Sequence, residues 1–289
     1  MSMSIQTKSV PRCPVCDSSG VLYLHSLKDV LYAVPGAWSM RRCTVRSCRT
    51  LWLDPVAIES ELYKLYSKYS THVGPGLLSE HEIKKSRIGF LKKFLNNMRS
   101  SALSISRGYP NTIPKYQQFL YSALSRLIPA WRDAQLANIF YVPYVKNGRL
   151  LDVGCGNGSS MLLMRAQGWN VEGFDFDPSA IHKALEQNLN VSVGDIYSKK
   201  FDDEVFDVIM MNHVIEHLPD PKKVLQECLR ILKKGGVLVA FTPNSKSFGF
   251  GLFKNNWRGL EVPRHLQVFT SDSLELIGKS VGFSDVKSL

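Results

Sequence analysis

The second half of the chain alternates short apolar runs with longer segments of helical periodicity. The apolar runs predict strands at 149–153, 171–175, 191–194, 206–212 and 236–242. The segments between and after them predict helices at 159–167, 178–187, 221–234 and 271–281. Strands that alternate with helices pair in parallel, so the pattern predicts an α/β fold, a Rossmann-like, mainly parallel sheet with helices on both faces.

The middle of the chain has apolar residues at helical rather than strand spacing. One stripe is Leu91, Phe94, Leu95 and Met98, set among basic residues that include Lys84, Lys85 and Arg87. A second stripe after Pro114 is formed by Leu120, Leu124, Leu127 and Ile128. The Ser- and Gly-bearing stretch 100–112 between the stripes predicts a flexible loop.

The first 56 residues contain four of the six cysteines and several prolines. Their apolar pieces at 21–24 and 51–53 are short, which is typical of small strands around a metal site. We therefore predict three segments: a zinc-ribbon-like segment at 1–56, a helical substrate or linker region at 57–146, and a cofactor-binding domain at 147–289.

The basic residues are concentrated in the first half of the chain. The net charge is +11 in total, with 21 Lys and Arg against 8 Asp and Glu over residues 1–149. A basic face attracts anionic partners such as nucleic acid, lipid headgroups or phosphorylated small molecules. We find no apolar run long enough to cross a bilayer and no signal-peptide core at the N-terminus, and so we predict a cytoplasmic protein.

A glycine-rich turn follows the first predicted strand of the second half. The run Asp-Val-Gly-Cys-Gly-Asn-Gly at 152–158 leads directly into a helix. Glycines let the backbone approach a ligand, and the amides at a helix N-terminus favour an anionic group. The spacing is Gly-x-Gly-x-Gly, with Ser159 where a dinucleotide fingerprint places its last glycine.

Acidic residues stand at corresponding places in the turn region and the next two strands. Asp152 precedes the first glycine, where a carboxylate is able to orient an ammonium group. Asp175 closes the second strand and is suited to accept both hydroxyls of a ribose. Asp195 closes the third strand and is placed to accept from an adenine amino group.

These motifs resemble the class I S-adenosylmethionine (AdoMet) dependent methyltransferases. The resemblance covers residues 148–242 and includes Gly-Phe-Asp, Gly-Asp-Ile, Phe-Asp-Val-Ile and the Gly-Gly-Val-Leu strand. It implies AdoMet as the cofactor, with Asp152 and Gly154 at the methionine end, Asp175 on the ribose and Asp195 on the adenine. The predicted cofactor-binding residues are Asp152, Gly154, Cys155, Gly156, Gly158, Asp175, Phe176, Asp195, Ile196 and Asn212.

A cluster of histidines and a glutamate marks the expected site of chemistry. If 213–217 forms a helical turn, His213, Glu216 and His217 share one face, and His265 follows later in the chain. These candidate catalytic residues act as a base, as metal ligands or as cofactor lining. The loop 243–267 is long and aromatic, as loops that cover a substrate often are.

The run Glu-His-Leu-Pro-Asp-Pro resembles the branch that contains ubiquinone-biosynthesis O-methyltransferases and many sugar and natural-product methyltransferases. That resemblance implies a small-molecule acceptor and O- or C-methylation. In the relatives that bind a divalent metal, a glutamate stands where this chain has His213. Two other functions remain open: an RNA methyltransferase, not favoured because no aromatic RNA-binding motif accompanies the basic half, and a non-catalytic zinc and AdoMet scaffold. A basic amphipathic helix at 83–99 leaves peripheral membrane contact open as well.

The N-terminal cysteines form two close pairs, Cys13 with Cys16 and Cys43 with Cys48. Four thiolates suit one tetrahedral, structural zinc ion, and the segment resembles the zinc-ribbon heads of some bacterial methyltransferases. Cys155 and Cys228 are expected to fill the core. At the other end, residues 283–289 predict one further strand where the family sheet usually has two, so that the last strand is missing.

Overall fold

The computed structural model describes residues 5–66 and 88–288, and its central feature is a five-stranded parallel sheet. The strands are β6 (Arg149–Val153), β7 (Asn170–Asp175), β8 (Asn190–Val193), β9 (Phe206–Asn212) and β10 (Leu232–Phe241). Their order is β10-β9-β6-β7-β8, and every neighbouring pair is parallel. The predicted α/β fold is therefore confirmed, and the order reverses beside β6, where ligands of such sheets bind.

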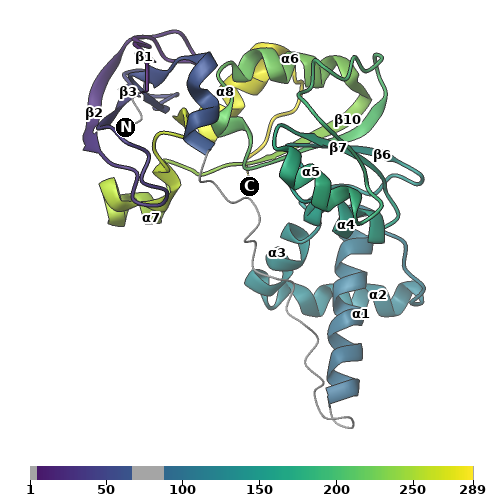
Figure 1. Cartoon of the computed structure of the whole chain (residues 1–289). Helices are drawn as coiled ribbons and strands as arrows, with labels where there is room; N and C mark the ends of the chain where they lie inside the picture. The colour runs from purple at the N-terminus through teal and green to yellow at the C-terminus, as the bar shows by residue number, and fades with distance from the viewer. Residues whose placement is uncertain (1–4, 67–87, 289) are drawn as a thin grey trace.

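Helices cover both faces of this sheet, as Figure 1 shows. They are α4 (Ser159–Ala166), α5 (Pro178–Leu185), α6 (Pro221–Ile231) and α8 (Ser271–Val281). α6 begins where the sequence predicts, because the Asp220 side chain accepts from the Lys223 amide at 3.1 Å and Pro221 occupies the first turn. The loop between β10 and α8 contains the short helices α7 (Phe248–Phe253), η3 (Lys254–Asn256) and η4 (Arg258–Leu260).

Two secondary-structure predictions near the end of the chain are wrong. The helix predicted at 221–234 ends at Ile231, because Leu232 already pairs with Phe206 and opens β10. The predicted strand at 283–289 is not formed over the described residues 283–288. Instead the Phe283 amide donates to Gly278 at 3.1 Å, and the segment folds back so that Val286 lies against Gly278 of α8.

The first part of the chain forms an antiparallel sheet. It contains β2 (Gly20–Leu27), β3 (Trp38–Cys43) and β4 (Leu51–Leu53), and a separate pair joins β1 (Thr7–Lys8) to β5 (Val56–Ala57). The pieces predicted as strands at 21–24 and 51–53 lie in β2 and β4, as expected.

This antiparallel sheet takes its fourth strand from the other end of the chain. β11 (Gln267–Val268) pairs with β4, so that Gln267 lies opposite Trp52. One hydrophobic cluster also contains both Trp52 and the parallel-sheet residue Ile209. The N-terminal segment and the cofactor-binding part therefore share a sheet and a core, and the three-segment division stays a prediction.

The middle of the chain is helical in its described part. It contains η1 (Glu59–Tyr66), α1 (Ile88–Arg107), α2 (Lys115–Arg126) and α3 (Pro129–Ala137). In Figure 1, α1 to α3 extend below the sheet as a separate lobe.

The structure corrects one prediction for this lobe and does not describe all of another. The loop predicted at 100–112 is wrong over residues 100–107, because α1 continues to Arg107 and buries Ala102 and Leu103 against neighbouring elements. The start of the basic helix predicted at 83–99 lies outside the described residues, as do Lys84, Lys85 and Arg87. In the described part of the chain, no helix is both long and apolar enough to cross a membrane.

Candidate active site

The glycine turn joins β6 to α4 at the carboxyl edge of the parallel sheet. Gly154, Gly156 and Gly158 all have positive φ, at 70°, 53° and 80°. A Cβ on Gly154 would lie 2.6 Å from Val214, and one on Gly158 would lie 2.2 Å from Leu189. A Cβ on Gly156 would meet nothing within 4 Å. Two of the glycines thus serve packing, whereas Gly156 borders open space where a ligand has room.

Asp152 is a buried carboxylate with no protein partner. Its exposure is 1%, and neither of its oxygens has a hydrogen-bond partner among the described residues. Burial, together with the charge of Asp175, raises the pKa of Asp152 to about 7. A buried carboxylate left unpaired is costly, and a ligand ammonium group would satisfy it. The methionine end of AdoMet offers that group, so the residue present fits the predicted cofactor.

Asp175 stands beside Asp152 at the end of β7. Its two oxygens accept from the backbone amides of Gly156 and Asp177, both at 2.9 Å. Burial raises the pKa of Asp175 even though these amides oppose the shift. The two amides hold the carboxylate against the glycine turn, and its predicted contact with a ribose stays a prediction.

The other predicted cofactor residues line the same edge with differing exposure. Phe176 is 59% exposed, while Ile196 is buried in the core, and Asn212 ends β9. Asp195 is exposed, and its Oδ1 accepts from the amides of Tyr197 and Ser198. Their contacts with a cofactor stay predictions.

The buried cysteines outside the N-terminal pairs pack as expected. Cys228 is 0% exposed and Cys155 is 7% exposed, each within an apolar cluster. Burial raises the pKa of both thiols, so neither is suited to act as a nucleophile.

The predicted acceptor-side residues come together at the end of β9. His213, at a φ of 57°, precedes η2 (Ile215–His217), and His213 Nδ1 lies 3.1 Å from Glu216 Oε1. The His217 and His265 rings are 4.7 Å apart in an edge arrangement. His265 Nε2 lies 4.0 Å from the same Glu216 oxygen. The structure thus brings together all four side chains that the sequence singles out.

Backbone carbonyls fix the tautomers of two of these histidines. His217 Nδ1 lies 3.0 Å from the Arg264 carbonyl, and His265 Nδ1 lies 2.9 Å from the Gly259 carbonyl. A carbonyl oxygen only accepts, so each Nδ1 carries a proton and donates. In a neutral ring the unprotonated atom is then Nε2. In both rings Nε2 is therefore the nitrogen that does not face a backbone carbonyl.

The pKa values of the clustered side chains shift in different directions. Burial would raise the pKa of Glu216, but the hydrogen bond with His213 and the neighbouring imidazoles lower it overall. Burial, and then the charge of His265, lowers the pKa of His217 to about 4. The hydrogen bond with Glu216 raises the pKa of His213. At neutral pH the cluster therefore holds an ionised Glu216 beside a neutral His217.

Glu216, His217 and His265 also form a candidate metal site. One ligand atom of each lies within 4.8 Å of the others, and Glu216 Oε2 is buried with no partner among the described residues. Neutral imidazoles whose Nδ1 donates to a carbonyl are the usual metal-binding arrangement. The donor set therefore fits a divalent cation.

Tyr66, at the end of η1, closes the site from the N-terminal side. Its hydroxyl lies 3.1 Å from His217 Nδ1, and its ring meets Phe176 edge-on at a centroid distance of 5.1 Å. One side chain thus connects the histidine cluster with the residue that follows Asp175.

A buried ion pair supports the cluster from the antiparallel sheet. The Arg264 guanidinium is 0% exposed and donates to both oxygens of Asp29, at 2.7 and 3.0 Å. The same Asp29 carboxylate accepts backbone amides of its own loop, including those of Leu31 and Val34. Because the Arg264 carbonyl accepts from His217, the loop around Asp29 fixes the position of that histidine.

A second support comes from Gln267 in β11. Its side-chain amide donates to the carbonyls of Ile215 and Leu218, at 2.9 and 2.8 Å. The Leu266 amide donates to the Glu216 carbonyl at 2.9 Å. The strand that joins the antiparallel sheet is thus also the strand that fastens η2.

Sequence reasoning missed Asp29, Tyr66, Arg264 and Gln267. Arg264 and Gln267 flank His265 in the run Pro-Arg-His-Leu-Gln, but nothing in that run indicates a partner 235 residues away. For Arg264 and Gln267 the sequence offers one signal, their position beside His265, and it offers none for Asp29 and Tyr66.

The four N-terminal cysteines converge at the end of the antiparallel sheet. The Cys13 and Cys48 sulfurs are 3.6 Å apart, and those of Cys16 and Cys43 are 3.4 Å apart. A tetrahedral zinc with Zn–S bonds of about 2.3 Å separates its sulfurs by about 3.8 Å. The hydrogen bond from Cys13 lowers the pKa of Cys48 to about 5, which favours a thiolate there. The donor set and spacing fit a structural zinc ion.

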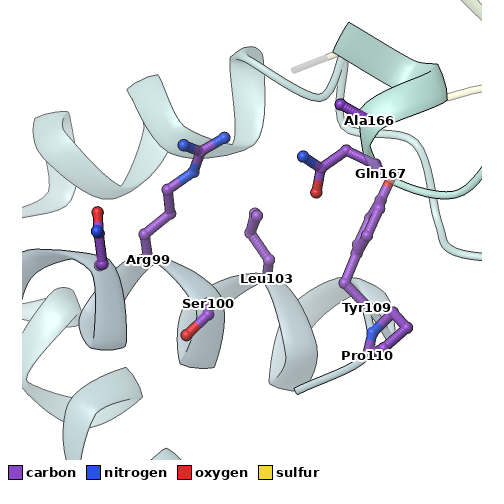
Figure 2. A pocket seen from close by; sticks show the side chains of 8 residues that line it. Arg99, Ser100, Leu103, Tyr109, Pro110, Ala166 and Gln167 are labelled. Carbon is purple, nitrogen blue, oxygen red and sulfur yellow. The ribbon is translucent and has the colours of Figure 1, made fainter. Parts of the chain in front are cut away.

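A cavity of about 470 Å³ lies away from these sites, between α1 and the C-terminal end of α4. In Figure 2, Arg99 and Gln167 extend toward it from opposite sides, with Tyr109 along one wall. Because the glycine turn lies at the other end of α4, this cavity is not part of the candidate active site.

Comparison with known proteins gives one family match. A model described as a methyltransferase domain matches residues 118–288. The chain is 34% identical over 125 residues to a ubiquinone biosynthesis O-methyltransferase of Pseudomonas fluorescens, covering 40% of this chain and 54% of that protein. It is 35% identical over 103 residues to a 2-methyl-6-phytyl-1,4-hydroquinone methyltransferase of Synechocystis, covering 34% of this chain and 32% of that protein. The matches thus span about half or less of these relatives.

Solved structures with a similar fold include a SAM-dependent methyltransferase from Archaeoglobus fulgidus. It is 30% identical, with a TM-score of 0.44, over 52% of this chain and 66% of that chain. A possible histamine N-methyltransferase from Thermotoga maritima is 19% identical, with a TM-score of 0.44, over 69% of this chain and 78% of that chain.

Proposed function

The chain belongs to the methyltransferase-domain family, and we propose that it transfers a methyl group from AdoMet to a hydroxyl oxygen of a small-molecule acceptor. The observation that carries this proposal is the buried, unpartnered carboxylate of Asp152 beside a glycine turn that leaves space at Gly156. A cationic amino-acid end and a nucleoside are what this arrangement would bind.

Different residues would bind the two ends of AdoMet. Asp152 and the turn amides would hold the ammonium and carboxylate of the methionine part, while Asp175 would accept the ribose hydroxyls and Asp195 the adenine amino group. When bound, AdoMet supplies a methyl group on a sulfonium, which is already a good leaving group. What remains for the protein is to hold the acceptor in line, which is worth about 7–11 kcal/mol in favourable cases.

His217 is our proposed general base. Its Nδ1 is held by the Arg264 carbonyl, and its lowered pKa keeps Nε2 unprotonated at neutral pH. Nε2 would take the hydroxyl proton as the oxygen attacks, and the ionised Glu216 nearby would stabilise the resulting imidazolium.

A divalent cation on Glu216, His217 and His265 is the second candidate role for this cluster. The unpartnered Oε2 of Glu216 favours it. The cation would lower the pKa of a bound hydroxyl, and no separate base would then be needed.

The relatives favour a particular class of acceptor. By their names, both act on quinone-related compounds, one of them as an O-methyltransferase. We therefore favour a ring hydroxyl over the sugar, glycan or other natural-product hydroxyls that the sequence left open. Zinc on Cys13, Cys16, Cys43 and Cys48 completes the proposal as a structural ion, since a closed four-thiolate site has no open position.

Calorimetric titration with S-adenosylhomocysteine tests the cofactor assignment. We expect binding in the micromolar range, with NADH giving none, and a loss of about a hundredfold or more in Asp175→Ala. Asp202→Ala is the matched control, because Asp202 is an exposed carboxylate away from the site. Equal affinity in all three proteins would contradict the proposal.

A second experiment separates base from metal. His217→Ala should lower methyl transfer to a hydroquinone acceptor by about 10²- to 10⁴-fold without weakening S-adenosylhomocysteine binding. If His217 acts as a base, chelators leave the wild-type rate unchanged once the zinc content is verified. Loss of activity on chelation, restored by Mg²⁺ or Mn²⁺ but not by zinc, would assign the metal role instead.

A further inference from the structure

Helix α2 exposes three large apolar residues to solvent and buries two serines. Tyr116, Phe119 and Leu120 are 73%, 69% and 60% exposed. Ser122 and Ser125 are buried, at 3% and 0% exposure, and Tyr121 and Leu124 are half-buried. A helix that packs only on its own domain does not usually expose three large apolar residues on one face, so a partner beyond the described residues is expected to cover this face.

The exposed stripe continues past the end of the helix. Leu127 and Ile128, in the turn before α3, are 77% and 51% exposed. Positions 116, 119, 120, 123 and 127 follow helical spacing and are all exposed, so they form one continuous face. We call these residues, with Ile128, the α2 face.

The helical lobe that contains the α2 face is basic. Over residues 88–140 the chain has seven Lys and Arg residues and one acidic residue, Asp133. Within the described part of the chain, none of these seven cations forms an ion pair. Lys115 and Arg126 stand at the two ends of α2 and flank the face directly. Lys115 and Arg126 therefore bracket the apolar stripe, in a lobe whose described residues have a net positive charge.

We propose that the α2 face docks on an anionic lipid bilayer. Tyr and Phe at one end, Leu and Ile at the other, and long cationic side chains at both margins match the requirements of a helix lying in the membrane interface. The basic residues would lie at the level of the headgroups, where each adds attraction to anionic lipid. This inference goes beyond the proposed methyl transfer and does not depend on it.

Other occupants fit the observations less well. A second copy would bring together two lobes whose described residues have a net positive charge, which like-charge repulsion opposes. Nucleic acid would use the cations, but its phosphate backbone gives nothing in return for burying Leu120, Leu127 and Ile128. The bilayer accounts for the apolar stripe and the charge together.

Vesicle co-sedimentation of the full chain tests the proposal. We compare phosphatidylcholine vesicles with vesicles that contain about a third phosphatidylglycerol, and expect at least about tenfold tighter binding to the anionic vesicles. The double variant Phe119→Asp with Leu127→Asp should lose about tenfold or more of that affinity. Leu185→Asp on α5 is the matched control, because Leu185 is likewise an exposed leucine, at 52%, but lies away from the α2 face. This variant should bind vesicles as the wild type does.

Every variant is also titrated with S-adenosylhomocysteine, so that the folded state and the proposed function are read separately. Retained cofactor binding with lost vesicle binding supports the α2 face as the docking surface. Equal vesicle binding by the double variant and the wild type would overturn the proposal. So would a wild type that stays off vesicles yet dimerises in light scattering, with the double variant monomeric, because the face would then be a subunit contact.

Discussion

The cofactor side and the acceptor side of the candidate site are built in different ways. The cofactor side is local in sequence: Asp152, the three turn glycines and Asp175 lie within 24 residues, on two neighbouring strands and on the turn that follows the first of them. The acceptor side is assembled from four distant segments, which contribute Asp29, Tyr66, the 213–217 turn and the 264–267 run. A site formed by one contiguous motif is recognisable in the sequence, whereas a site assembled from distant segments is not.

The two sides also differ in which parts of the chain hold their key side chains in place. On the cofactor side, the Gly156 amide of the glycine turn and the Asp177 amide just after β7 hold the carboxylate of Asp175. On the acceptor side, His217 depends on the Arg264 carbonyl, and Arg264 depends on Asp29 in the antiparallel sheet. We therefore expect damage to the N-terminal segment to affect methyl transfer much more than cofactor binding.

Removing the zinc that we propose is the strongest way to test this comparison. The Thr270 hydroxyl donates to the Cys48 carbonyl at 2.8 Å, so the cysteine cluster directly contacts the start of α8. Structural zinc supplies about 10 kcal/mol or more of folding free energy in small zinc peptides. In Cys48→Ser we expect zinc content and methyl transfer to be lost, with S-adenosylhomocysteine affinity reduced less than about tenfold.

Metal analysis and calorimetry on the same sample give the measurement. Zinc-free protein that transfers methyl groups at the normal rate would show that the acceptor side does not depend on this segment.

The next test removes only the ion pair between Asp29 and Arg264. Asp29→Asn removes the two-oxygen counter-ion of the buried Arg264 cation and leaves it only Glu261, at 3.1 Å; breaking a buried ion pair costs up to about 3–5 kcal/mol of unfolding free energy. We expect a lower kcat as the Arg264 carbonyl shifts from His217, with cofactor affinity unchanged. Asp285→Asn is the control, because its pair with Lys287 is 70% exposed and contributes about 0–1 kcal/mol. Equal destabilisation of both variants in denaturant unfolding would contradict the assigned role.

The comparison also explains which parts of the fold the sequence predicts. The strands β6 and β9 match their predicted bounds because each is a short apolar run with clear ends. The end of α6 was misplaced because Lys233, Lys234 and Gly235 form a good helix ending locally, yet the pairing of Leu232 with Phe206 starts a strand first. Tertiary pairing thus outweighed a local signal.

The same reasoning applies to the site. His213, Glu216, His217 and His265 were singled out because their chemistry is conspicuous, and three of them lie in one short run. The contribution of the antiparallel sheet was not foreseeable, because it depends on β11 joining β4 across more than 200 residues. No periodicity in the sequence encodes that pairing.

The pH dependence of cofactor binding sharpens the assignment of Asp152. Its pKa of about 7 exceeds the usual value of a carboxyl, so below pH 7 the free protein holds a proton there. Pairing with a ligand ammonium requires release of that proton. We expect S-adenosylhomocysteine affinity to rise about tenfold per pH unit toward pH 7 and then level off.

The same linkage makes the free protein less stable as pH rises from about 4 toward 7, because the unfolded chain has already released the proton. Asp152→Asn should abolish the slope of affinity with pH. Asp207→Asn, at the opposite end of the sheet beside Arg149, should retain it. A flat profile in the wild type would remove Asp152 from the ammonium site.

The smallest expected effect distinguishes backbone strain from ligand space within the cofactor turn. Gly156 and Gly108 both have positive φ, at 53° and 76°, and neither has any atom within 4 Å of an added Cβ. Alanine at either position should therefore cost about 1 kcal/mol of stability through the same backbone strain. Only Gly156 borders the proposed cofactor, so only Gly156→Ala should also weaken S-adenosylhomocysteine, by about tenfold, since the new methyl group occupies ligand space. If calorimetry finds equal affinities for the two variants, the open space at Gly156 does not face the cofactor, and the glycine serves the turn alone.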